Sequence, residues 1–110
     1  MRQYEVWWAR LPEPAGERPV LLLSRDDAYE YLNKFVAAEV TTNIRHVPAE
    51  VRLGAAEGLS KPSVANCDNL RTIARSRLIK QLGALNKERH HEVKRAVGYA
   101  FNWEELMDIG

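Results

Sequence analysis

The chain alternates short runs of branched and aromatic residues with polar segments that contain proline or glycine. Residues 4–11, "YEVWWARL", and residues 18–24, "RPVLLLS", are the first two runs, and only a short segment separates them. This pattern predicts two strands joined as a hairpin. Four consecutive aliphatic residues in the second run predict a strand that is buried on both faces.

The apolar pattern continues with a short helix and further strands. Residues 25–34, "RDDAYEYLNK", predict a short helix that is capped by Asp26 or Asp27, with Tyr29 and Leu32 on one face. Residues 78–85, "LIKQLGAL", alternate as in a strand, with a helix as the alternative interpretation. The remaining predicted strands are residues 35–42, 49–53 and 63–67.

The last element is an amphipathic helix that follows Asn86, its predicted cap. Its apolar positions recur at intervals of three and four residues. Gly98 interrupts that stripe and indicates either close backbone packing or an early helix end. We therefore expect a mainly β (α+β) domain, a small barrel or curled sheet closed by a C-terminal helix, over residues 1–110, with its core at 4–101 and an acidic-apolar tail at 102–110. The stripe consists of Val93, Ala96, Val97, Ala100 and Phe101.

Composition narrows the functional classes. The 110 residues suffice for one domain, and 16 Lys+Arg against 15 Asp+Glu argue against the strongly basic surface that coats duplex DNA. A single cysteine, Cys67, excludes an internal disulfide, and a buried, inert thiol is its expected state. The N-terminus lacks a signal-peptide pattern and the longest aliphatic run is too short for a bilayer, so we expect a cytoplasmic protein with no membrane contact.

No metal or cofactor motif is recognisable. His90 and His91 are adjacent and point in different directions on a helix, so they do not form a zinc-binding pair, and we expect both at a solvated edge. The sequence contains no glycine-rich phosphate loop and no serine or cysteine nucleophile motif. We therefore expect no metal and no cofactor, and the remaining chemistry is arginine with hydroxyls and carboxylates, a set that suits a phosphodiester.

RNA itself supplies the nucleophile for metal-free cleavage. Its 2′-hydroxyl attacks the phosphorus, so the protein accepts that proton, protonates the leaving 5′-oxygen and neutralises the charge that develops on the phosphate. Arginine suits the last task because its planar fork stays charged and binds phosphate oxygens in pairs. Threonine can add a neutral hydrogen bond.

Several motifs resemble, in order and spacing, those of one toxin family. The order "YEVWWARLPEP", "RPVLLLSRD", "VTTNI", "GLSKPSVANCDNLRTI" and "RLIKQLGAL" is similar to that of the MazF/PemK (Kid) family of type II toxin–antitoxin endoribonucleases, over roughly residues 4–101. The most specific pieces are "RPV", "TTN" and "DNLRTI". The resemblance implies a small SH3-like barrel of antiparallel strands (PemK/CcdB-like) with a C-terminal helix, assembled as a homodimer.

The resemblance also implies an activity and its partners. Family members cut single-stranded RNA at short sequences and leave 2′,3′-cyclic phosphate and 5′-hydroxyl ends. A cognate antitoxin inhibits them with a disordered acidic segment. By resemblance, Arg18, Thr41 and Asp68 are the expected catalytic residues, and Pro19 holds Arg18 extended at the start of a buried strand. The residues expected to bind RNA are Ser24, Thr42, Asn43, His46 and Arg71.

Each of these residues has a structural alternative. Arg18 can pair with a carboxylate at the rim of the barrel, and Thr41 and Thr42 can be ordinary strand threonines. Asp68 can form a turn with Asn69, and Arg71 can support the fold. His46 can be an ordinary surface histidine.

Two further functions stay open, and so do the roles of the tryptophans and of the C-terminal tail. A CcdB-like toxin with this fold binds DNA gyrase, although its Trp-Gly-Ile end is absent from the "MDIG" terminus, and a non-catalytic RNA-binding barrel is the third hypothesis. Trp7 and Trp8 alternate along a strand, so we expect one in the core and the other at a dimer contact, with stacking on a base as the alternative. The tail is expected to cover a neighbouring basic groove or to help bind a partner.

Overall fold

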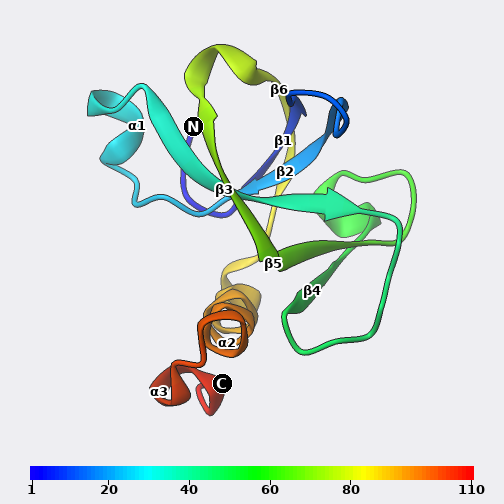
Figure 1. Ribbon diagram of the computed structural model, residues 1–110, viewed down its shortest axis with the longest axis vertical. Helices are drawn as coiled ribbons and strands as arrows, with labels where there is room; N and C mark the ends of the chain where they lie inside the picture. The colour runs from blue at the N-terminus through cyan, green and yellow to red at the C-terminus, as the bar shows by residue number, and fades with distance from the viewer.

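The computed structural model describes all 110 residues and consists of one curled antiparallel sheet with a C-terminal helix (Figure 1). Six strands follow the order β4-β5-β3-β2-β1-β6. This confirms the predicted mainly β fold, including residues 78–85 as a strand. The elements are β1 (Glu5–Arg10), β2 (Glu17–Leu22), α1 (Ala28–Tyr31), β3 (Lys34–Thr41), β4 (Glu50–Leu53), η1 (Ala55–Glu57), β5 (Ser63–Ala74), η2 (Arg75–Arg77), β6 (Leu78–Ala84), η3 (Lys87–Arg89), α2 (His90–Phe101) and α3 (Glu104–Met107).

Strand β2 is the centre of two apolar cores, which explains its unbroken aliphatic run. Leu21 points into a cluster that α2 completes with Val93 and Ala96. Val20 and Leu22 point to the opposite face, into a second cluster. All three β2 side chains are fully buried, so the prediction of burial on both faces is confirmed. Each such side chain contributes about 1.5–3 kcal/mol when it leaves water.

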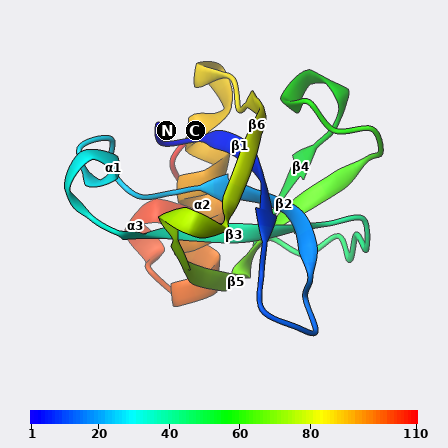
Figure 2. The ribbon, with the colours of Figure 1, turned by 90° about the horizontal axis from the view of Figure 1, so that it is seen from above.

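The two edges of the sheet approach each other through glycines. The segment that follows β4 lies against β6, and a Cβ on Gly58 would lie only 2.0 Å from the carbonyl oxygen of Leu82. A Cβ on Gly83 would in turn lie 2.3 Å from the carbonyl oxygen of Glu57. Only glycine permits this backbone contact, which brings the open ends of the curled sheet together (Figure 2).

A bulge in β5 corrects the prediction that this strand ends at residue 67. Ala38 of β3 pairs with Leu70, whereas the next residue, Glu39, pairs with Asn66, so residues 67–69 are extra on β5. The strand therefore continues to Ala74 instead of turning at the Asp-Asn pair. Bulges bend a strand and redirect its side chains, and this bulge lies beside the candidate site.

The C-terminal helix is confirmed, but its boundaries differ from the prediction. Residues 87–89 form a 3₁₀ turn after Asn86, whose side chain makes no capping hydrogen bond, and α2 begins at His90. Phe101, predicted in the apolar stripe, is 50% exposed, because the helix ends there and its ring stacks on Trp103. Gly98 contacts Leu106 of α3 closely, as its sequence position indicated. The tail thus folds back on α2 instead of covering a basic groove (Figure 1).

Three smaller predictions are also corrected. Leu32 is exposed because α1 ends one residue before it, whereas Tyr29 is buried as expected. His90 is not simply solvated, since its ring stacks on Tyr4 with centroids 3.6 Å apart. The third correction concerns the tryptophans: Trp7 packs against the second cluster but is only half-buried, and Trp8 is half-buried as well.

The α1 segment carries no capping side-chain hydrogen bond, although Asp27 occupies the cap position. No helix in the structure has the length and apolar character needed to span a bilayer. Cys67 is a free, buried cysteine, and burial raises the pKa of its thiol to about 12. The thiol is therefore protonated and unreactive at neutral pH, as expected.

Candidate functional site

The β1–β2 hairpin presents Arg18 at the second position of β2. Its backbone is fixed by pairing with Ala9, and Pro19 follows it into the buried part of the strand. The guanidinium donates through Nε to the carbonyl of Ala15 at 3.3 Å and through Nη1 to the Glu39 carboxylate at 3.2 Å. Both the chain and the side chain of Arg18 are therefore held in place.

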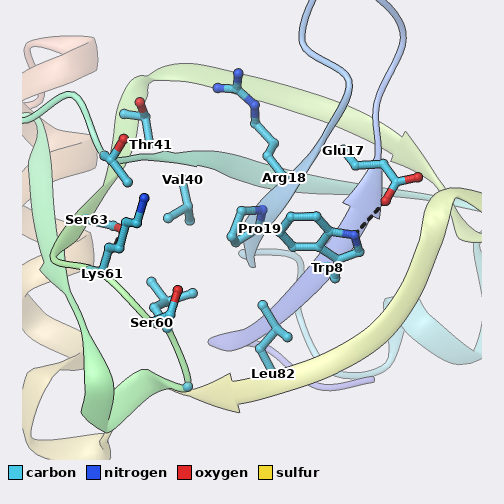
Figure 3. Close-up of a pocket in the computed structure, with 13 residues that line it drawn as sticks. Trp8, Glu17, Arg18, Pro19, Val40, Thr41, Ser60, Lys61, Ser63 and Leu82 are labelled. Carbon is cyan, nitrogen blue, oxygen red and sulfur yellow. Dashed lines mark hydrogen bonds between the residues drawn. The ribbon is translucent and has the colours of Figure 1, made fainter.

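Arg18 pairs with a carboxylate, as its structural alternative proposed, but this pairing leaves donors free. A guanidinium has five N–H donors, and only one contacts Ala15 and one contacts Glu39. The side chain of Arg18 remains 33% exposed. Arg18 lines the cavity described below and the smaller space next to it, where its free donors can bind an anion (Figure 3).

Thr41 is the last residue of β3, the strand that pairs with β2. It pairs with Val64 of β5, which fixes its backbone, and its hydroxyl accepts the backbone N–H of Asn43 at 3.1 Å. The same hydroxyl keeps its own proton to donate. Figure 3 places Thr41 and Arg18 on neighbouring strands at the same rim of the cavity.

The cavity has a volume of about 460 Å³ and lies between the β1–β2 hairpin, the end of β3 and the loop before β5. Lys61 extends into it from that loop, and its ammonium forms no ion pair (Figure 3). Trp8 forms the opposite wall and donates its indole N–H to Glu17 at 2.8 Å. The lining residues are Trp8, Glu17, Arg18, Pro19, Val40, Thr41, Thr42, Gly58, Leu59, Ser60, Lys61, Ser63 and Leu82.

A smaller, entirely polar depression of about 150 Å³ adjoins this cavity. Arg18 and Thr41 line both spaces, so they stand where the two meet. We call the two spaces together the groove. The smaller depression is lined by Arg18, Glu39, Thr41, Asn43, Arg45, Asn66 and Asn69.

Two carboxylates line the groove and differ in their surroundings. Hydrogen bonds from the Trp8 indole and then from Arg10 lower the pKa of Glu17, which lies at the exposed rim. An acid with a lowered pKa stays ionised and is a weaker proton acceptor at neutral pH. Glu39 is buried, with a side chain only 5% exposed, and its oxygens accept hydrogen bonds from Arg18, Asn69 and Arg71.

The structure brings some of the predicted site residues together and leaves others apart. Arg18, Thr41, Thr42 and Asn43 all line the groove. Asp68 lies in the β5 bulge, where its backbone N–H donates to Asn66 at 3.0 Å, and its side chain does not line the groove.

Three predicted RNA-binding residues have other contacts. Ser24 accepts the backbone N–H of Val36 at 2.8 Å and lies outside the groove. His46 is exposed, and its ring lies 3.2 Å from a guanidinium nitrogen of Arg52. Arg71 donates to Glu39 but does not itself line the groove. Of these three, only Arg71 is connected to the groove, and that connection runs through Glu39.

Sequence reasoning missed Lys61 and Glu39. Lys61 stands in the loop motif "GLSKP", where an unpaired cation beside a proline was the available signal. Glu39 is a lone acid between apolar residues of a strand, and such an acid is rarely buried without a partner. No group of three or more His, Cys, Asp or Glu side chains lies close enough together to hold a metal ion.

The groove therefore combines one oriented arginine, one free lysine and hydroxyl groups. Fixed positive charge and aimed donors stabilise negative charge that develops on a bound group, and they act without reorganisation because strands hold them. Trp8 offers an aromatic surface on which a base can stack. These are the features of a site for a polyanion with flat bases.

Comparison with known proteins agrees with this geometry. The sequence model of the PemK-like, MazF-like toxins of type II toxin–antitoxin systems matches residues 2–101. Endoribonuclease MazF3 of Mycobacterium tuberculosis is 38% identical over 90 residues, which cover 82% of this chain and 87% of that protein. The family match includes all six strands and α2.

Solved structures give the same result. The M. tuberculosis toxin MazF-mt6 superimposes with a TM-score of 0.84 at 35% identity, over 89% of this chain and 96% of that one. MazF in a MazE–MazF structure from Deinococcus radiodurans gives a TM-score of 0.72 at 25% identity, over 100% and 97% of the two chains. This chain therefore belongs to the family of PemK-like, MazF-like toxins of type II toxin–antitoxin systems.

Proposed function

We propose that this toxin is a metal-independent endoribonuclease that cuts single-stranded RNA, mRNA above all, at short sequences. The 2′-hydroxyl of the substrate attacks the adjacent phosphorus, the bond to the 5′-oxygen breaks, and the products carry a 2′,3′-cyclic phosphate and a 5′-hydroxyl. The proton of the 2′-hydroxyl leaves and the 5′-oxygen gains one, so the step is balanced without a co-reactant. Since mRNA is the substrate, the protein acts in the cytoplasm.

The observation that carries this proposal is the orientation of Arg18 beside Thr41 at the centre of the groove. The free N–H donors of Arg18 bind the phosphate oxygens as charge develops on them, and the Thr41 hydroxyl adds a neutral donor. Lys61 neutralises a further phosphate of the strand. The curated relatives that match most of the chain carry the name endoribonuclease, which supports the same activity.

The proposal assigns less direct roles to the remaining predicted residues. Thr42 and Asn43 contact the strand beside the scissile phosphate, because they line the groove next to Thr41. Asp68, at the exposed bulge, contacts RNA that extends beyond the groove or takes part in proton transfer. Ser24 and His46 lie farther along the surface, and Arg71 contributes through Glu39.

We further propose a homodimer and a cognate antitoxin with a disordered acidic segment. The MazE–MazF structure from D. radiodurans contains a toxin of this fold with its antitoxin, which supports such a partner. An acidic segment complements the groove, where Arg18, Arg45 and Lys61 gather. By occupying the same cations, the segment would exclude RNA.

The deciding experiment incubates the purified protein with mixed single-stranded RNA in excess EDTA, beside Arg18→Ala, and identifies the ends at every cut. Cuts that carry cyclic phosphate and 5′-hydroxyl ends, and that vanish in the variant, support the proposal and reveal the recognised sequence. Intact RNA with folded, antitoxin-free protein would contradict it. A gyrase-binding assay then tests the CcdB-like alternative, and RNA binding without cleavage would identify a non-catalytic barrel.

A further inference from the structure

Glu39 is a buried acid that joins the two arginines of the "RPV" and "RTI" motifs. Its Oε1 accepts from Arg18 Nη1 at 3.2 Å. Its Oε2 accepts from Arg71 Nε and from Asn69 Nδ2, the latter at 3.1 Å. The Glu39 side chain is 5% exposed, whereas the two arginine side chains are 33% and 31% exposed. One carboxylate therefore holds two half-buried cations in fixed positions.

The fold itself does not require an acid at this position. The neighbouring β3 residues Ala37, Ala38 and Val40 are buried and apolar. Burial of a carboxylate is unfavourable unless charges and donors compensate it, and here three side chains do so. The β5 bulge supplies Asn69, the amide donor, at the place where the pairing register shifts. The cluster thus depends on three separate strands.

We propose that Glu39 is a positioning residue that sets both the orientation of Arg18 and the charge of the groove. This inference rests on the nuclease function proposed above. Two arginines and one carboxylate leave one net positive charge, and that charge faces the groove on Arg18. Arg71 does not line the groove, and its Nε is engaged with Glu39, so it serves as the counter-charge of that carboxylate.

Two opposite consequences follow for a variant without this charge. Arg18 loses the charged carboxylate that aims it, and the single amide oxygen of a glutamine cannot serve both arginines, so the developing phosphate charge is stabilised less well and kcat falls. The cluster also gains one unit of positive charge, so the polyanionic substrate binds as tightly as before or more tightly. A purely structural role would lower stability without separating kcat from binding in this way.

The test compares Glu39→Gln with Glu57→Gln in the full-length protein. Glu57 is a matched control, since its side chain is also 5% exposed and paired with an arginine, Arg89, but it does not line the groove. Three quantities are measured: kcat on the RNA that the wild type cleaves, Kd for the same RNA with a 2′-deoxy nucleotide at the cut, and the salt dependence of that Kd. Thermal melting accompanies each measurement.

For Glu39→Gln we expect kcat to fall at least tenfold, with Kd unchanged or lower. The slope of log K against log salt should steepen by about 0.7, the value for one more neutralised phosphate on a single strand. For Glu57→Gln we expect a lower melting temperature with kcat within about twofold of wild type. Glu39→Asp keeps the charge but cannot span both arginines, so we expect reduced kcat with the wild-type salt slope.

The alternative outcomes separate the two proposals. Wild-type cleavage that Glu39→Gln and Glu39→Asp leave unchanged would overturn the role of Glu39 alone. A fall in kcat that Glu57→Gln shows equally would do the same, because it would reflect stability. If Glu39→Gln does not fold, Glu39→Asp decides by its kcat. Absence of any cleavage by the wild type would overturn the nuclease proposal and this role with it.

Discussion

Two buried glutamates of this protein form arginine clusters with opposite balances of charge. At the groove, Glu39 is shared by Arg18 and Arg71, so positive charge is in excess. At the base of α2, a single arginine, Arg89, is shared by Glu57 and Glu92, so negative charge is in excess. The two buried carboxylates are equally shielded, with side chains 5% exposed.

In the Arg89 cluster, the hydrogen bonds connect parts of the fold to one another. Arg89 also donates to the carbonyl of Arg52 at 2.6 Å, which ties the start of α2 to β4. Glu57 accepts the backbone N–H of Gly54 at 2.6 Å, which closes the 3₁₀ turn that packs on β6. In the Glu39 cluster, by contrast, Arg18 has N–H donors that make no hydrogen bond to the protein. Free N–H donors on a residue that lines the groove, and not burial or pairing, therefore distinguish the binding arginine, Arg18, from the structural one, Arg89.

The largest expected difference between the clusters is in catalysis. Arg18→Lys keeps the charge but loses the fork that binds Ala15, Glu39 and phosphate together, so we expect the cleavage rate to fall about 100-fold or more. Arg89→Lys should leave the rate nearly unchanged. Single-turnover cleavage of one defined RNA measures both. Equal rates for the two variants would remove the distinction between the clusters.

The next largest effect is on stability, and here we expect it at Arg89 instead of Arg18. Arg89→Ala leaves the buried Glu57 without its charged partner and removes the tie to β4, so we expect a loss of about 2–3 kcal/mol in the free energy of unfolding. Urea denaturation measures this loss. Exposed Arg25→Ala serves as the control, since its ion pair with Asp27 lies in solvent and should contribute less than about 1 kcal/mol. If Arg89→Ala lowers the free energy of unfolding by no more than Arg25→Ala does, the structural role of Arg89 is contradicted.

Thr41 provides a smaller test at the groove. Thr41→Val keeps the β-branched shape that a strand favours and removes only the hydroxyl, so we expect about a tenfold fall in kcat, the effect of one hydrogen bond of roughly 1.4 kcal/mol. Thr41→Ser keeps the hydroxyl and should retain most of the activity. Thr41→Ser is therefore the matched control, because it changes the shape of the side chain but keeps the hydroxyl. Wild-type activity in Thr41→Val would make Thr41 an ordinary strand threonine.

The sequence predicted the parts of the molecule that local pattern determines. The β2 run showed burial on both faces because two cores meet at one strand, and the arginine before Pro19 marked its entry. Similarly, Gly98 indicated close packing before its contact with Leu106 was visible. In each case the structural feature lies within a few residues of the sequence pattern that predicted it.

The missed features arise from pairing between distant strands. Glu39 meets Arg71 because the β3–β5 register pairs Arg71 with Ala37, two residues before Glu39 on the same face, and no local pattern encodes that register. Lys61 reaches the groove because the loop after η1 contacts β6 at Leu82 and lines the same cavity as the end of β3. The helix start was displaced from Asn86 because a 3₁₀ turn lets Arg89 reach Glu57. Such contacts depend on tertiary structure that propensity does not contain.

The smallest expected effect is a pH dependence of the α2 cluster. The hydrogen bonds from Arg89 lower the pKa of Glu92 in the folded protein below its usual value. The pair therefore stabilises the fold above the unfolded-state pKa of about 4.3, and this contribution disappears as the pH falls through the lower folded-state pKa. Because Glu92 is partly exposed, solvent screening limits the effect to less than about 1 kcal/mol. We expect Glu92→Gln to be less stable than wild type at pH 7, and we expect the difference to shrink as the pH falls below about 4.3, as measured by urea denaturation. A stability difference that does not change with pH would mean that packing of the side chain, and not its charge, stabilises this end of α2.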